Sequence, residues 1–201
     1  MNGPASVFVG ITGASGACYA LRLTQALRAA GCSLQLCISD NGILVLRHEL
    51  GLSAEGRPAV TAAFLERADI KAMVYEADDL AAPPASGSSF PDAVVICPCS
   101  VATVAHIALG TSRTLIHRVG DVALKERRTL VVVPRETPLT QIHLRRLLEL
   151  AEAGAVVLPA MPAFYSLPQT LQDAVDHVVG KVLNSLGLEQ ALFRPWDGGQ
   201  P

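Results

Sequence analysis

The sequence is poor in charge and in aromatic rings: of its 201 residues 17% are charged, 4% are aromatic, and the formal net charge is −2. Because it has no basic tail, nucleic acid is not expected as a partner. No apolar stretch is long enough to span a bilayer, and the N-terminus has no signal-peptide pattern, so we expect a cytoplasmic protein without membrane contact. Half of the residues are hydrophobic, which predicts surface buried in a homo-oligomer.

Metal and disulfide motifs are also missing. The five cysteines form no Cys-x-x-Cys pair and most lie in apolar runs. This indicates reduced core thiols, not a disulfide framework or a zinc site. Asp78 and Asp79 do not extend to the Asp-Asp-x-x-Asp clamp that holds magnesium in diphosphate-using prenyl synthases. We therefore expect no metal.

Three common nucleotide motifs are absent. Gly-x-x-x-x-Gly-Lys does not occur, so the chain has no P-loop. Gly10, Gly13 and Gly16 are evenly spaced, unlike the G-x-G-x-x-G fingerprint of dinucleotide-binding folds. The same stretch is close to the T-G-x-x-x-G-x-G of short-chain dehydrogenases, but no tyrosine is followed four residues later by the lysine that those enzymes use.

The sequence does contain a strand, a turn and a helix at 7–27. Residues 7–11 are an apolar run typical of a buried parallel strand, and an amphipathic helix follows the small residues 12–16. Small residues let a ligand approach the backbone, and a helix start offers free N–H groups. We therefore expect a phosphate at this turn, with a tight turn that binds no ligand as the alternative.

Turns of the same kind follow other predicted strands. The strand 34–38 ends at Ser39, which either contacts a ligand or only caps the next helix. The strand 93–97 is followed by a small polar turn and a helix start at 98–103. The segment 81–89 directly precedes that strand, so we favour a binding loop over a surface linker. The turns 12–16 and 98–103 are both of a size to bind a phosphate. One ligand that lies across both turns explains them better than two unrelated helix caps.

Charged residues mark two further places. The helix 114–128 carries Arg118 and Lys125 on one side, two turns apart. Arg135 and Glu136 follow the buried strand 130–133 and lie between two prolines. A strand end is an expected position for chemistry, with a plain ion pair as the alternative.

Strand and helix patterns alternate five or six times with short turns between them. This predicts an α/β fold with a Rossmann-like (flavodoxin-like), doubly wound, mostly parallel sheet in a single domain. Residues 1–190 would form that domain. Residues 191–201 would form a C-terminal tail, whose one tryptophan either docks on a neighbouring subunit or is disordered.

Six blocks in one order resemble the flavin prenyltransferase family, the UbiX/Pad proteins once called aromatic acid decarboxylases. The blocks are 12–16, 82–88, 95–100, 121–128, 131–136 and 158–165. The resemblance runs from residue 7 to about residue 187 and implies that the domain 1–190 binds flavin. It also implies a metal-independent enzyme that transfers a dimethylallyl group from dimethylallyl phosphate to N5 and C6 of reduced FMN. The prenylated FMN would serve a partner UbiD-type decarboxylase, and the enzyme would form a dodecamer with sites at its interfaces.

The resemblance implies a role for each residue that matches a family motif. FMN would be held by Gly13, Ala14, Ser15, Ser39, Ser100, Val101, Ala102, Thr103 and Arg135. Dimethylallyl phosphate would be held by Ser86, Gly87, Lys125, Tyr165 and Lys181. Arg118 would reach a cofactor site from an adjacent subunit. Ser15, Lys125 and Glu136 are the candidate catalytic residues, with Glu136 relaying a proton to the leaving phosphate or from flavin C6.

Two positions depart from the family pattern. Leu80 stands where an aromatic ring is common, and it has no π face to offer an allyl cation. Lys181 stands where an arginine is expected, so the charge is kept and the bidentate fork is lost. Two other functions stay open. A flavin-dependent cysteine decarboxylase of the same superfamily would typically carry Pro-Ala-Ser-Ala-Asn-Thr at 98–103, and an FMN carrier would bind flavin without catalysis.

Overall fold

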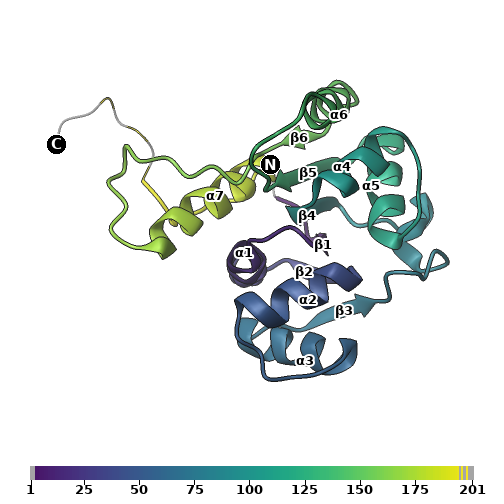
Figure 1. Cartoon of the computed structure of the whole chain (residues 1–201), viewed down its shortest axis with the longest axis horizontal. Helices are drawn as coiled ribbons and strands as arrows, with labels where there is room; N and C mark the ends of the chain where they lie inside the picture. The colour runs from purple at the N-terminus through teal and green to yellow at the C-terminus, as the bar shows by residue number, and fades with distance from the viewer. Residues whose placement is uncertain (1–2, 195, 197, 199–201) are drawn as a thin grey trace.

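The computed structural model describes residues 3–194, 196 and 198. One sheet of six strands runs through it, in the order β3-β2-β1-β4-β5-β6, and every neighbouring pair is parallel (Figure 1). The strands are β1 Ser6–Ile11, β2 Ser33–Ile38, β3 Ala72–Tyr75, β4 Ala93–Cys99, β5 Thr129–Pro134 and β6 Val156–Val157. The helices are α1 Ala17–Ala29, α2 Asp40–Glu49, α3 Arg57–Ala68, α4 Val101–Ala108, α5 Leu115–Lys125, α6 Gln141–Glu152 and α7 Leu171–Ser185. The predicted parallel α/β sheet is confirmed.

Helices cover both faces of the sheet because successive side chains of a strand point to opposite sides. In β1, Val7 and Val9 pack into a core with side chains of α1, α2, α3 and α7. Phe8, between them, packs into a second core with side chains of α4, α5 and α6. Burying a ring such as that of Phe8 contributes about 1.5–3 kcal/mol. The strands are almost continuously apolar, so their side chains stabilise the helix layers on both faces of the sheet.

The strand order reverses at β1. From β1 the chain moves outward through β2 and β3 on one side, then returns to β4 and moves outward through β5 and β6 on the other. In open α/β sheets, ligands bind outside the carboxyl ends of the strands at such a switch point. This places the turns that follow β1 and β4, which the sequence singled out, at the same place in the fold.

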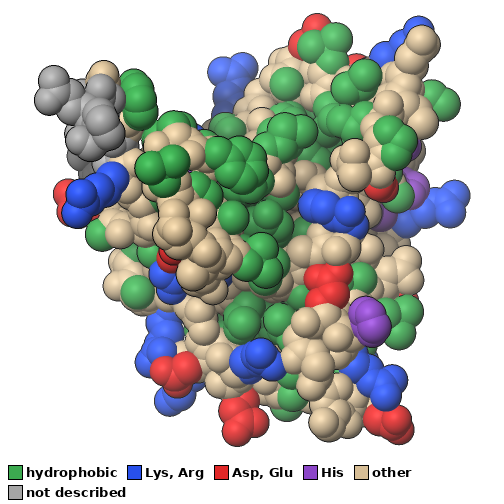
Figure 2. All heavy atoms as spheres, turned by 60° about the vertical axis from the view of Figure 1, so that its left-hand side comes forward, with side chains coloured by type: hydrophobic (Ala, Val, Ile, Leu, Met, Phe, Trp, Pro, Cys, Tyr) green, Lys and Arg blue, Asp and Glu red, His purple; other side chains and the backbone are tan. Residues whose placement is uncertain are grey.

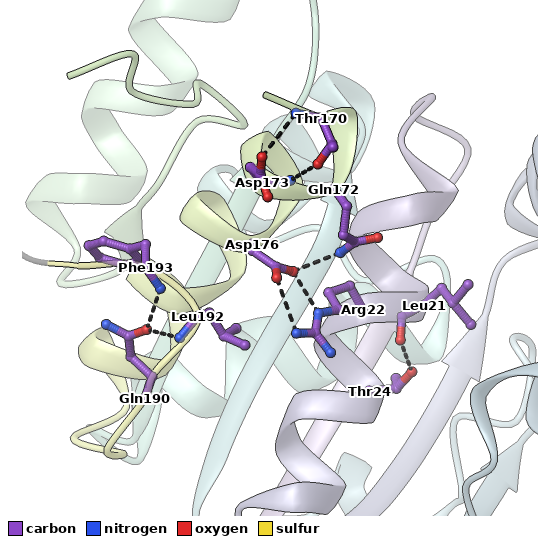
Figure 3. A network of polar contacts seen from close by, with 10 residues as sticks. All are labelled: Leu21, Arg22, Thr24, Thr170, Gln172, Asp173, Asp176, Gln190, Leu192 and Phe193. Carbon is purple, nitrogen blue, oxygen red and sulfur yellow. Dashed lines mark hydrogen bonds and ion pairs between the residues drawn. The ribbon is translucent and has the colours of Figure 1, made fainter. Parts of the chain in front are cut away.

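Helix α7 is fastened to α1. The Arg22 guanidinium donates from Nε to Asp176 Oδ1 over 2.6 Å and from Nη2 to Oδ2 over 3.2 Å, so the pair is bidentate (Figure 3). Thr170 and Asp173 form a capping box that begins the helix. The segment before it leaves the body of the molecule between β6 and α7 (Figure 1). Its apolar side chains are exposed at Met161, Phe164 and Leu167.

Several smaller expectations can be compared with the structure. The segment 81–89, for which a binding loop was favoured over a surface linker, contains two 3-10 turns, Pro83–Ala85 and Gly87–Ser89. All five cysteines are free, and four are buried. Among the described residues, no helix combines the length and the apolar character needed to cross a membrane.

Candidate functional site

One threonine joins the two turns at the switch point. The Thr12 hydroxyl donates to the carbonyl oxygen of Pro98 over 2.8 Å and accepts from the Ser100 amide over 2.7 Å. The Thr12 amide donates to the same Pro98 oxygen over 3.2 Å. Thr12 is buried, so these bonds are shielded from water. The turn 12–16 after β1 and the turn 98–103 after β4 therefore form one surface.

Position 13 of the turn 12–16 has no room for a side chain, so it requires glycine. A Cβ on Gly13 would lie 2.4 Å from Asn41 Cβ, at the start of α2. Gly42 is equally crowded, since its Cβ would lie 2.7 Å from the carbonyl oxygen of Ile11. This close packing brings Ser39 beside the turn. Its hydroxyl accepts from the Gly42 amide over 3.0 Å, so Ser39 caps α2.

Backbone amides of the turn 12–16 are available to a ligand. Among the hydrogen bonds within the described chain, the amides of Gly13, Ala14 and Ser15 are not donors. The next two amides are used, because Gly16 and Ala17 both donate to Glu49 Oε2 over 2.8 Å. A carboxylate thus occupies the N-terminus of α1, and a ligand phosphate would be bound by the amides that precede it.

Glu49 is a site residue that the sequence reasoning missed. No motif surrounds it, and it lies at the end of α2. The one available signal was indirect: α1 has neither an acidic residue in its first turn nor a side-chain cap, so its free amides required a partner from elsewhere. That partner comes from 33 residues further along the chain.

The charge of Glu49 is stabilised by its surroundings. Partial burial acts to raise the pKa of Glu49, but the Ser15 hydroxyl, the Ala17 and Gly16 amides and the Arg135 charge together lower it. Arg135 follows β5, the neighbour of β4, and its Nε donates to the Ser15 carbonyl oxygen over 2.8 Å. An ionised carboxylate and a guanidinium therefore lie on either side of Ser15.

The turn after β4 is built as a helix start. Ser100 caps α4 by accepting from the Thr103 amide over 3.3 Å, and the two hydroxyls lie 3.1 Å apart. Val101 and Ala102 form the first residues of α4. The capping role of Ser100 is thus confirmed, and its contact with a ligand stays a prediction.

A second group of predicted residues gathers around α5. Gly87 lies against Glu126, since a Cβ on Gly87 would approach Glu126 Oε1 to 2.4 Å. Lys125 Nζ forms an ion pair with the same oxygen at 3.0 Å. Arg118 donates from Nε to the carbonyl oxygen of Ala85 over 3.3 Å and pairs through Nη1 with Asp121 at 3.0 Å. Arg118 therefore holds the segment 81–89 of its own chain.

A third group lies on α7 and the segment before it. The ring of Tyr165 meets that of His177 edge-on, with centroids 6.0 Å apart, and that of Trp196 at 5.6 Å. Lys181 is one turn beyond His177 on the same helix. Because α5 and α7 cover opposite faces of the sheet, the structure does not bring Lys125 together with Tyr165 and Lys181 within one chain.

Glu136 is exposed at the end of β5. Its Oε1 accepts from the amide of the following residue, Thr137, over 3.0 Å. Among the ion pairs of the described residues, none joins Glu136 to Arg135. Its carboxylate is therefore not engaged by the neighbouring guanidinium. The described residues contain no group of three or more His, Cys, Asp or Glu side chains placed to hold a metal ion.

The family model described as Flavoprotein matches residues 1–184. A curated relative, the flavin prenyltransferase UbiX of Halalkalibacterium halodurans, is 47% identical over 188 residues, 94% of this chain and 91% of that protein.

Two solved structures share the fold. The crystal structure of AnUbiX in complex with FMN and dimethylallyl pyrophosphate has a TM-score of 0.87 and 36% identity, and the match covers 98% of this chain and 100% of that one. A dodecameric FMN-dependent UbiX-like decarboxylase from Escherichia coli has a TM-score of 0.84 and 38% identity over 96% of this chain and 99% of that one. Sequence identity, coverage and fold agree: the chain belongs to the flavin prenyltransferase (UbiX) family of flavoproteins.

Proposed function

We propose that this enzyme transfers the dimethylallyl group of dimethylallyl phosphate to N5 and then C6 of reduced FMN. The observation that carries the proposal is the joined pair of turns at the switch point, with Arg135 beside them. Its product, prenylated FMN, would be the cofactor of a UbiD-type decarboxylase. The five free cysteines fit the reducing cytoplasm as its compartment.

The residues present fit FMN. The amides of 13–15 remain for a phosphate, and the helix starts at Ser39 and Ser100 add positive potential on the same surface. Gly13 has no room for a side chain because Asn41 lies against it, so glycine lets the turn pack tightly against α2. Arg135 adds a fixed positive charge next to Ser15.

The charged side chains of the second and third groups fit a prenyl phosphate. When the allylic C–O bond breaks, negative charge develops on the leaving phosphate, and the ammonium groups of Lys125 and Lys181 would stabilise it without a metal. Reduced FMN supplies the nucleophilic ring. Glu136 is an exposed carboxylate beside Arg135, suited to take the proton lost from C6 and to pass a proton to the phosphate.

This chemistry requires more than one copy of the chain. The lysines proposed to hold the phosphate lie on opposite faces of the sheet, so a neighbouring copy would supply part of each site. Hydrophobic side chains gather on the side of the molecule shown in Figure 2. Exposed apolar residues of the segment before α7, such as Phe164 at 72% and Leu167 at 73%, would be covered by the assembly. We propose a dodecamer.

We expect the purified protein to have a mass well above that of a dimer when measured by light scattering at micromolar concentration. The chain mass is 21.1 kDa. Substituting Phe164 and Leu167 by serine should lower the measured mass, because both side chains are exposed in the single chain and would be buried in the assembly. A monomeric mass for the unchanged protein would contradict both the assembly and the shared site.

Mass spectrometry of the bound flavin tests the reaction. After anaerobic incubation with reduced FMN and dimethylallyl phosphate, the flavin should be heavier by one isoprene unit, with no metal added. Unchanged FMN after incubation would support the carrier alternative. Oxidative decarboxylation of a cysteine-containing peptide, with no flavin adduct, would support the cysteine decarboxylase. Tight NAD(P) binding without FMN binding in a calorimetric titration would contradict all three.

A further inference from the structure

His177 lies between two segments that are far apart in the sequence. Its side chain is buried on α7, with 7% of the residue exposed. On one side its Nδ1 accepts from the Ala163 amide over 3.3 Å, in the segment before α7. On the other side its ring contacts that of Phe193 at a centroid distance of 4.7 Å. One imidazole therefore touches both segments.

The C-terminal segment is fitted to α7 at this point. Gln190 Oε1 accepts from the amides of Leu192 and Phe193 over 2.7 and 3.3 Å, which turns the chain back toward the helix (Figure 3). The Phe193 ring lies over Gly180, where a Cβ would approach it to 2.6 Å. The absence of a side chain at 180 thus lets the ring reach His177.

The imidazole is suited to accept a hydrogen bond. Burial and the nearby Lys181 charge lower the pKa of His177, so the ring is neutral at pH 7 and one nitrogen carries no proton. With Nδ1 as the acceptor for Ala163, Nε2 holds the proton. The Ala163 amide thereby has a hydrogen-bond acceptor, in a segment whose backbone forms few other hydrogen bonds.

We propose that His177 is a positioning residue that fixes Tyr165 against α7, one helical turn from Lys181, by accepting the Ala163 amide and by packing against Phe193. This inference rests on the proposed function, in which Tyr165 and Lys181 hold the prenyl phosphate. Tyr165 is two residues from Ala163, and its ring meets the His177 ring and Trp196. The C-terminal segment therefore helps to build the substrate site of its own chain.

Two substitutions separate the hydrogen bond from the ring contact. His177→Phe keeps an aromatic ring and removes the acceptor, whereas His177→Asn keeps an acceptor oxygen near the position of Nδ1. We expect His177→Phe to raise KM for dimethylallyl phosphate about tenfold, since an unpaired, half-buried amide disfavours the arrangement by roughly that factor. His177→Asn should stay within about threefold of the unchanged enzyme. FMN affinity should not change, because its proposed contacts lie at the switch point.

Chymotrypsin gives a readout that does not depend on activity. Phe164 and Tyr165 are cleavage sites within the positioned segment. The assembly proposed above would cover this segment, so the variants are compared at equal oligomeric mass, checked by light scattering. Cleavage there should be about tenfold faster in His177→Phe, since local opening sets the rate. Gly180→Ala should also accelerate it, because the added Cβ displaces Phe193. Asn184→Ala, at an exposed position of the same helix, is the control and should match the unchanged protein.

The outcomes distinguish this inference from the function on which it rests. If the unchanged enzyme prenylates FMN but His177→Phe shows the same KM and the same cleavage rate, the positioning role is wrong and the function stands. If FMN affinity falls by the same factor by which KM rises, the variant is generally unfolded, and the positioning role is also wrong. If the unchanged enzyme does not use dimethylallyl phosphate, the proposed function fails, and the cleavage rates decide whether His177 holds the segment.

Discussion

Replacing Glu136 by glutamine is expected to lower turnover by about two orders of magnitude while FMN remains bound. The carboxylate lies after β5, next to Arg135, and its described partner is the Thr137 amide. Glutamine keeps the size and an acceptor oxygen but can neither take up nor release a proton at neutral pH. If Glu136 handles the proton at C6, an adduct joined only at N5 should accumulate. Single-turnover kinetics with mass spectrometry of the flavin measures both effects.

The opposing explanation treats Glu136 as an ion-pair partner of Arg135. It predicts weaker FMN binding and a lower melting temperature instead of a slow chemical step. The described ion pairs do not include that contact, which favours the first explanation. Glu66→Gln, at an exposed position on α3, is a matched control. Unchanged turnover in Glu136→Gln would show that the residue has no catalytic role.

Glu49→Gln should also slow turnover by about two orders of magnitude, here through the loss of a fixed charge and not of a proton carrier. The Glu49 carboxylate accepts from the Gly16 and Ala17 amides and lies next to Ser15 and Arg135. Glutamine retains one oxygen for those amides, so the turn keeps its shape while the negative charge disappears. If the prenyl transfer takes place beside Ser15, the loss of this charge should affect kcat more than FMN binding, because charges fixed around a reacting centre stabilise the transition state.

A purely structural Glu49 would behave otherwise. Hydrogen bonds to a charged group contribute about 1.5–3 kcal/mol, so a capping role alone predicts a lower melting temperature and unchanged kcat in the protein that stays folded. Thermal melts of Glu49→Gln and of Glu55→Gln, an exposed acid paired with Arg47, provide the comparison. Equal kcat for the two variants would leave Glu49 as a cap only.

The local parts of this site were readable from the sequence. Apolar runs predicted β1 and β4, small residues predicted the turns behind them, and Ser39 and Ser100 carried the signature of helix caps. The alternation of strands and helices predicted a parallel sheet, whereas the strand order and the contact of Arg135 with the first turn came from the structure. These inferences depend on short-range patterns and on a topology with few alternatives.

The long-range contacts were not readable. Glu49 completes the first turn from the end of another helix, and no spacing rule connects it to Gly16. The tail 191–201 was expected to dock its tryptophan on a neighbouring subunit or to be disordered, yet Phe193 and Trp196 contact His177 and Tyr165 of the same chain. Residues 195, 197 and 199–201 of that tail lie outside the described residues. Such contacts arise from packing geometry, which one sequence does not contain.

The hydroxyl of Thr12 has a consequence for how this enzyme can be altered. Thr12 joins the turn after β1 to the turn after β4 through its hydroxyl and its amide, so the two turns move together. A substitution meant to reshape one turn for a different flavin would displace the other with it. Changes of specificity are therefore more accessible at the exposed positions of α5, α7 and the C-terminal segment, which lie outside the scaffold that the two turns share.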